Sequence, residues 1–221
     1  MKFITLSNIL LILILPFLLF LIVLEFIQFD NSFYREKFLE YAVEQNVPQA
    51  LSLHEQVIKF LQGKSNELPN DFNEREKQHL LDVRNVIRIS TILLYVLIIW
   101  FALLLIISAS ILKVSNYIIN FTGKVLVFGG ILTIVLAAVL LLLINSDFSA
   151  AFESFHKLFF EKGTYVFDPA KELIVRLYPE QLFMDLGIRI SKNVIIASAV
   201  IILIGLLLIF LPKSKKNKYS K

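Results

Sequence analysis

Residues 89–112 have the sequence ISTILLYVLIIWFALLLIISASIL, which contains no charged side chain. A helix of about 20 mostly apolar residues can cross the hydrocarbon core of a bilayer, so this segment predicts a transmembrane helix. Similar apolar segments occupy residues 6–27, 125–145 and 194–211. The chain of 221 residues is 57% hydrophobic and only 18% charged, with the charges clustered between these segments. We therefore expect an all-α dominated integral membrane protein with four transmembrane helices.

The charges outside these segments predict the orientation of the chain. Lysines without acidic neighbours occur in the short loop at residues 113–124 and in the tail at residues 212–221, whereas residues 28–88 and 146–193 carry both signs. Loops rich in lysine and arginine stay in the cytoplasm. We therefore expect a multi-pass cell-membrane protein with both termini cytoplasmic and a small extracytoplasmic cap formed by the two longer loops. The pI of about 9.2 reflects these basic membrane edges and does not indicate a nucleic-acid partner.

The first half of the expected cap contains three helical patterns. The first ends near Pro48 and the second at Gly63; their apolar members are Tyr34, Phe38 and Tyr41, then Leu53, Val57, Phe60 and Leu61. A third helix should begin at Asn73, because Glu76 follows it by three residues, as in a capping box. This helix can continue through His79 directly into the second membrane segment.

The second half of the cap is dominated by residues 155–179, with the sequence FHKLFFEKGTYVFDPAKELIVRLYP. This stretch is too polar to cross a bilayer and too aromatic for an ordinary solvated linker, so we expect it to lie at a membrane surface or to fold over a site there. Within it, Lys162–Gly163 predicts a turn and Asp168–Pro169 predicts the start of a helical piece. Just before it, Ser146 and Asp147 can cap a short helix that contains His156.

Two of the three histidines, His79 and His156, fall on the extracytoplasmic side, each close to a predicted membrane boundary. This shared depth follows from the topology and is the strongest functional signal from the residues alone. Asp82 lies on the same helix face as His79, where its carboxylate can fix the ring tautomer. His54 lies on an amphipathic piece without a matching cluster, and we interpret it as a surface histidine.

Several kinds of catalytic machinery are absent from the sequence. It has no cysteine, no glycine-rich phosphate loop and no G-x-S-x-G nucleophile elbow. Two imidazoles and a carboxylate can hold zinc, so a metal-dependent membrane hydrolase using His79, Asp82 and His156 is an alternative to metal-free acid–base chemistry. A non-catalytic membrane scaffold with an aromatic lipid-binding cap is a further alternative.

Two histidine motifs resemble the signatures of a known family. The sequence HLLDVR at residues 79–84, preceded by KFLQG at residues 59–63, resembles the first signature of the lipoprotein intramolecular transacylase family. The residues that resemble the second signature are Phe155, His156, Phe159, Phe160, Tyr165, Phe167, Asp168, Pro169, Glu172, Leu173, Ile174, Tyr178 and Pro179. The resemblance extends over the whole chain. Tyr165 stands where we expect a tryptophan, Glu172 where an aspartate is usual, and Leu80 where methionine is common.

The resemblance implies acyl transfer within one lipid-modified protein. A fatty acyl group moves from the glyceryl ester of a lipoprotein to the α-amino group of its N-terminal cysteine. The implied catalytic residues are His79 and His156, and we favour His156 as the base and His79 as the acid or oxyanion partner. The expected lining of the substrate site comprises Asp82, Arg84, Phe155, Phe159, Phe160, Tyr165, Phe167 and Asp168. The expected partners are a diacylglyceryl-modified lipoprotein and membrane lipid, and no metal or other cofactor is expected.

Overall fold

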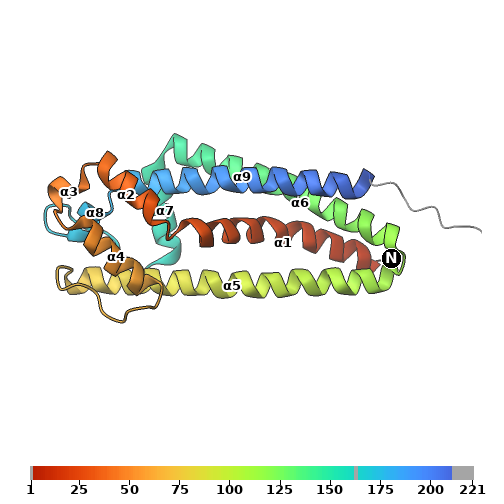
Figure 1. Cartoon of the computed structure of the whole chain (residues 1–221), viewed down its shortest axis with the longest axis horizontal. Helices are drawn as coiled ribbons and strands as arrows, with labels where there is room; N and C mark the ends of the chain where they lie inside the picture. Colours follow the sequence, from red (N-terminus) through yellow and green to blue (C-terminus); the bar gives the residue numbers. More distant parts are fainter. Residues whose placement is uncertain (1, 162–163, 211–221) are drawn as a thin grey trace, which may run out of the picture. The chain divides into compact units, whose positions relative to one another are not determined.

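The computed structural model of the chain describes residues 2–161 and 164–210 (Figure 1). Over this part of the chain the secondary structure consists of helices, with no strand. In chain order these are α1 (Lys2–Ile27), α2 (Asn31–Glu40), α3 (Val43–Asn46), α4 (Ala50–Leu61), α5 (Glu74–Leu112), α6 (Ser115–Ser146), α7 (Phe148–Phe159), α8 (Leu173–Leu177) and α9 (Glu180–Phe210). The expected all-α fold is confirmed.

Helices α1, α5, α6 and α9 are long and apolar enough to cross a membrane. They contain the predicted segments at residues 6–27, 89–112, 125–145 and 194–211, except for residue 211. That residue, the basic tail and the predicted turn at Lys162–Gly163 lie outside the described residues. The multi-pass membrane architecture expected from the sequence is therefore confirmed.

The connection between α5 and α6 is shorter than the loop that we expected at residues 113–124. Only Lys113 and Val114 separate the two helices. Lys113 has a φ of 55°, a left-handed conformation that is common just after the end of a helix. The remaining residues of the expected loop form the first turns of α6.

The chain divides into two compact units, to which α1, α5, α6 and α9 all contribute residues. The bundle unit comprises Met1–Val23, Leu94–Val139 and Ser191–Lys221. The cap unit comprises Leu24–Leu93 and Leu140–Ile190, and it contains all three histidines.

Glycines set the helix spacing in the bundle unit. A Cβ atom at Gly129 would lie 2.7 Å from the side chain of Leu15 in α1, and one at Gly130 would lie 2.6 Å from the side chain of Ile202 in α9. Real Cβ atoms do not approach other heavy atoms so closely. Helix α6 therefore packs closely against α1 and α9 at positions where it has no side chain.

The cap unit is built around apolar side chains from several short helices. Phe38 of α2, Val57 of α4 and Leu177 of α8 belong to one buried cluster and are each no more than 1% exposed. The first predicted helical piece is divided into α2 and α3 at Ala42, which has a left-handed φ of 50°. The second piece corresponds to α4, and Gly63, with a φ of 74°, follows its end as predicted.

Glu76 closes the predicted capping box at the start of α5. The Asn73 side-chain oxygen accepts from the Glu76 backbone N–H at 3.0 Å, and Glu76 Oε2 accepts from the Asn73 N–H at 2.6 Å. Glu76 Oε1 also accepts from the backbone N–H of Ile174 at 2.8 Å. The side chain, only 1% exposed, therefore caps α5 and ties α8 to it.

Aspartates shape the chain on either side of the aromatic stretch. Asp147 caps α7 as predicted, because its side chain accepts from the Ala150 N–H at 3.0 Å. The prediction that a helix begins at Asp168–Pro169 is wrong. Asp168 instead accepts from the Ala170 N–H at 2.9 Å and closes a turn, so α8 begins only at Leu173.

Replacing Glu76 by Ala should strongly destabilise the cap unit. The change removes the acceptor for two backbone N–H groups, so we expect a loss of about 2–4 kcal/mol in the free energy of unfolding. The measurement is the thermal unfolding midpoint of the purified protein in detergent. Glu74→Ala is the matched control, since the Glu74 side chain is 90% exposed. Equal midpoints for the two variants would contradict the role of Glu76.

Candidate active site

The structure brings His79 and His156 together in the cap unit. His79 lies near the start of α5, and His156 lies near the end of α7. Their ring centroids are 6.1 Å apart, and the ring planes differ by 20°. Residues far apart in the sequence thus present two nearly parallel imidazoles at one place, as the predicted topology required.

Aromatic rings enclose this histidine pair. Phe160 contacts both rings, with centroid distances of 4.9 Å to His79 and 5.4 Å to His156. Phe167 lies 5.4 Å from His79, and Tyr165 lies 5.1 Å from His156. Three of the residues expected to line the site therefore lie directly against the imidazoles.

The hydrogen bonds of the two imidazoles indicate different tautomers. His156 Nδ1 lies 2.7 Å from the backbone oxygen of Phe152, which can only accept. Nδ1 therefore carries the proton, and in the neutral ring Nε2 keeps a free electron pair. His79 Nδ1 is buried and has no partner among the described residues. A buried N–H without a partner is rarer than a buried acceptor without one, so the favoured neutral form of His79 carries its proton on Nε2.

Both imidazoles are biased toward the neutral form. Burial, together with the charge of a protonated His156, lowers the pKa of His79 from its ordinary value to about 4. Burial also lowers the pKa of His156, while the Phe152 carbonyl and the charge of Glu180 act in the opposite direction. At neutral pH the site therefore holds an uncharged imidazole pair in an apolar enclosure.

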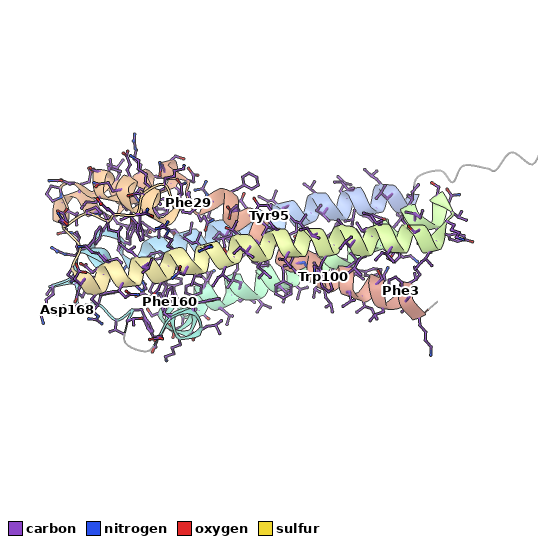
Figure 2. All side chains as sticks on the ribbon, turned by 90° about the horizontal axis from the view of Figure 1, so that it is seen from below. Phe3, Phe29, Tyr95, Trp100, Phe160 and Asp168 are labelled. Atoms are coloured by element: carbon purple, nitrogen blue, oxygen red, sulfur yellow. The ribbon has the colours of Figure 1, made fainter. Side chains whose placement is uncertain are left out.

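Three charged residues expected to line the site contact other parts of the cap unit instead. Asp82 accepts a hydrogen bond from Gln78 at 3.1 Å, so the carboxylate predicted to hold His79 bonds to another side chain. The guanidinium of Arg84 lies 4.8 Å from the ring of Phe60 and is directed toward the loop after α4. Asp168 closes its own turn, and Figure 2 shows it near the N-terminal end of α5, away from Phe160.

Phe155 and Phe159 form an outer layer beside the histidine pair. The ring of Phe155 lies 5.6 Å from His156 and 4.8 Å from Phe159. The two side chains are 47% and 48% exposed, respectively. They connect the enclosed pair to the apolar surface of α7.

The interpretation of His54 as a surface residue is wrong. His54 is 2% exposed, and its Nδ1 lies 3.0 Å from the hydroxyl of Tyr178. The ring packs against Tyr34 at 4.3 Å and Phe38 at 5.5 Å. Burial lowers the pKa of His54 to about 4, so this histidine is a neutral component of the cap core.

Three residues near the pair were missed by the sequence analysis. Phe152 lies 4.2 Å from His156 and is its hydrogen-bond acceptor, which the spacing of four residues in a helix could have indicated. Glu180 accepts from Ser149 at 2.6 Å and joins α9 to α7. Arg75 contacts Phe167, and no local pattern predicts that contact.

No group of three His, Cys, Asp or Glu side chains able to hold a metal ion occurs in the described part of the chain. The proposed zinc set of His79, Asp82 and His156 is thus only partly assembled, since the two imidazoles meet but Asp82 bonds to Gln78. The geometry favours acid–base chemistry by the imidazoles themselves.

A family model for the lipoprotein intramolecular transacylase Lit matches residues 9–183, which is most of the chain. The chain belongs to the lipoprotein intramolecular transacylase family. It is therefore an acyltransferase, and the hydrolase and scaffold alternatives are not favoured.

Solved structures of a relative agree with the fold of this transacylase. The membrane integral lipoprotein intramolecular transacylase Lit from Bacillus cereus matches with a TM-score of 0.80 at 22% identity, over 93% of this chain and 95% of that chain. Two further structures of that protein, in which a histidine is replaced by arginine or by alanine, match with a TM-score of 0.76 at 21% identity. They cover 93% of this chain and 92% or 93% of theirs. No curated protein sequence matches the chain.

The buried His54 should make the stability of the transacylase depend on pH. Since its pKa is about 4 in the folded protein, the unfolded chain binds more protons between about pH 4 and 6.5, and stability falls as the pH is lowered through this range. We expect His54→Phe to reduce the difference in thermal unfolding midpoint between about pH 7 and pH 5, because one group contributes up to about 3 kcal/mol.

Tyr178→Phe is the matched control for this measurement. It removes the hydrogen bond to His54 but keeps the titrating ring, so it should retain the pH dependence of the parent protein. If His54→Phe keeps the full pH dependence as well, His54 is not the neutral core residue described above.

Proposed function

We propose that the chain moves a fatty acyl group from the glyceryl ester of a diacylglyceryl-modified lipoprotein to the α-amino group of its N-terminal cysteine, with His79 and His156 as the catalytic residues. The observation that supports this most directly is the enclosed, neutral imidazole pair in a member of this family. Transfer of an ester to a neighbouring amine needs a base, a donor for the developing oxyanion and exclusion of water.

In this proposal His156 is the base. Its Nδ1–H donates to the Phe152 carbonyl, which fixes the ring and leaves Nε2 to accept a proton. The α-amino group has an ordinary pKa of about 8, so its uncharged form is available at neutral pH and attacks the ester carbonyl carbon. His156 Nε2 takes the proton that the attacking nitrogen must lose, a step that contributes about 10²–10⁴ in rate.

His79 is a neutral hydrogen-bond donor in the proposed reaction. Its lowered pKa disfavours the imidazolium form, so it does not deliver a proton as an acid. The Nε2–H instead donates to the carbonyl oxygen as that oxygen becomes negatively charged, which is a role for neutral imidazole seen in other enzymes. This assignment selects the oxyanion role from the two roles left open by the sequence.

The protons and bonds balance without a cofactor. The C–N bond forms as the tetrahedral intermediate builds, and the C–O bond to the glyceryl group then breaks. His156 returns the amine proton to the departing glyceryl oxygen, which regenerates the neutral ring. The products are an amide and a free glyceryl hydroxyl. The aromatic enclosure disfavours water as a competing nucleophile.

We also propose that membrane lipid covers the outer face of α7. Leu158 is 76% exposed, and it continues the apolar surface of Phe155 and Phe159. Only Asp147 separates α7 from the membrane helix α6, so α7 starts where that helix ends. An amphipathic helix in this position lies in the interface, where it can hold the acyl chains of the substrate beside the histidine pair.

Mass spectrometry of lipoproteins from cells with and without the chain tests the reaction. We expect one acyl group to shift from the glyceryl oxygen to the cysteine nitrogen when the chain is present. His156→Gln should lower the rate by about 10²–10⁴, because an amide cannot accept the proton. His79→Gln should keep more activity than His79→Ala, because the amide N–H₂ can still donate near the position of Nε2.

Membrane insertion of each variant is the control, measured by its amount in the membrane fraction. Unchanged lipopeptides despite confirmed expression of the parent chain would defeat the proposed reaction. Equal activity of His79→Gln and His79→Ala would overturn only the donor role of His79.

Single cysteines test the proposed topology, since the chain has no native cysteine. Ser154 in α7 and Ser115 at the start of α6 are both exposed, and both can be replaced by Cys. A membrane-impermeant maleimide should label Ser154→Cys in intact cells and Ser115→Cys only after permeabilisation. The opposite pattern would place the histidine pair and both termini on the other sides of the membrane.

A further inference from the structure

The wall of the site depends on a segment without regular secondary structure. Residues 164–172 form neither helix nor strand, yet they place Tyr165 at 5.1 Å from His156 and Phe167 at 5.4 Å from His79. Such a segment has no backbone ladder to hold it, so its position depends on side-chain contacts. The residue that anchors it therefore determines whether these rings stay against the imidazoles.

Arg75 makes three contacts to this segment. One guanidinium nitrogen, Nη2, donates to the backbone oxygen of Val166. Another, Nη1, lies 3.6 Å from the carboxylate of Glu172. The guanidinium plane also lies over the ring of Phe167, with Cζ at 5.0 Å from the ring centroid. The three contacts hold the segment on both sides of Phe167.

Arg75 and His79 are one helical turn apart on α5. Residues four apart in a helix lie on the same face, so the guanidinium and the imidazole present adjacent surfaces to Phe167. The phenyl ring contacts both, at 5.0 Å from Arg75 Cζ and 5.4 Å from the centroid of His79. The side chain of Phe167 thus connects the anchor to the catalytic pair.

We propose that Arg75 is a positioning residue for the acyl transfer: it fixes Phe167 against His79 and so keeps the imidazole pair enclosed. Only the catalytic effect of Arg75 rests on the proposed function. The anchoring of residues 164–172 does not depend on it. Arg75 does not touch the reacting atoms in this proposal and acts through Phe167.

The chemistry of the contacts requires arginine at this position. The Glu172 side chain is 11% exposed, and a carboxylate removed from water needs a positive partner. A guanidinium can pair with it, donate to a carbonyl and stack on an aromatic ring at the same time, because its donors lie in one plane. A lysine ammonium keeps the charge but loses the planar stacking. Arg75→Lys should therefore show a smaller defect than Arg75→Ala.

The test is steady-state kinetics of the purified full chain in detergent with a synthetic diacylglyceryl-cysteine lipopeptide. We expect Arg75→Ala to lower kcat by about tenfold to a hundredfold, the range known for displaced catalytic geometry, with little change in KM. Water reaching His79 would raise its pKa toward the ordinary value, so an NMR titration of the His79 ring should show its midpoint at higher pH than in the parent. Lys77→Ala is the matched control, since Lys77 lies in the same turn of α5 and pairs with Glu74.

A double-mutant cycle identifies the route of the effect. If Arg75 acts through Phe167, adding Arg75→Ala to Phe167→Ala should cause little further loss. Independent losses that multiply would overturn the proposal. So would a parental kcat and a parental His79 titration midpoint for folded Arg75→Ala, because a merely structural role lowers only the amount of folded protein.

Hydrogen–deuterium exchange tests the anchor without activity. Residues 164–172 should exchange faster in Arg75→Ala than in Lys77→Ala or in the parent. If the parent shows no acyl transfer, the proposed function fails while this comparison still decides the anchoring. If the parent transfers the acyl group and the exchange of this segment is unchanged in Arg75→Ala, the inference fails alone.

Discussion

The cap unit depends on the hydrogen bonds that the buried carboxylate of Glu76 accepts. A carboxylate that is 1% exposed is tolerated because both of its oxygens accept backbone N–H groups. One bond starts α5 and the other holds α8, so elements about a hundred residues apart share a single anchor. The chain between α7 and α8 must then pass the first turn of α5. This constraint brings Phe167 to His79, which lies one turn beyond Glu76.

The two histidines lie on helices that are packed to different extents. His79 lies on a long helix beside the buried core residue Leu80, and it is 7% exposed. Helix α7, which carries His156, has no buried residue. It contacts α9 through the ring of Phe152 against Phe183 and the hydrogen bond from Ser149 to Glu180. Elements with few buried apolar contacts open at low free-energy cost. We therefore infer that the proposed substrate enters on the α7 side, where the apolar surface also meets the proposed lipid.

The sequence predicted the features that depend on hydropathy or on residues only a few positions apart. The membrane segments, the capping box at Asn73 and the cap at Asp147 needed only hydropathy or residues three apart, and topology alone brought His79 and His156 to one side. His54 was misinterpreted although Ala50, Leu53, His54, Val57 and Ile58 form a continuous helical stripe, and all of them are buried. The partners of Arg75 could not be predicted, because Glu172 and Phe167 lie more than ninety residues away and no spacing rule connects them.

The site differs from a serine–histidine–aspartate triad because, among the described residues, no carboxylate is hydrogen-bonded to either imidazole. Asp82 accepts from Gln78, Glu172 pairs with Arg75, and Glu180 accepts from Ser149. In a triad the aspartate stabilises an imidazolium formed when a weakly acidic hydroxyl is deprotonated. An attacking amine does not need this help, because its uncharged form is already nucleophilic. The protonated α-amino group has a pKa of about 8, which lies close to the ordinary pKa of imidazole. In the proposed reaction a neutral, oriented base and a neutral donor are sufficient for such a nucleophile. Burial keeps both imidazoles uncharged, and the Phe152 carbonyl orients His156.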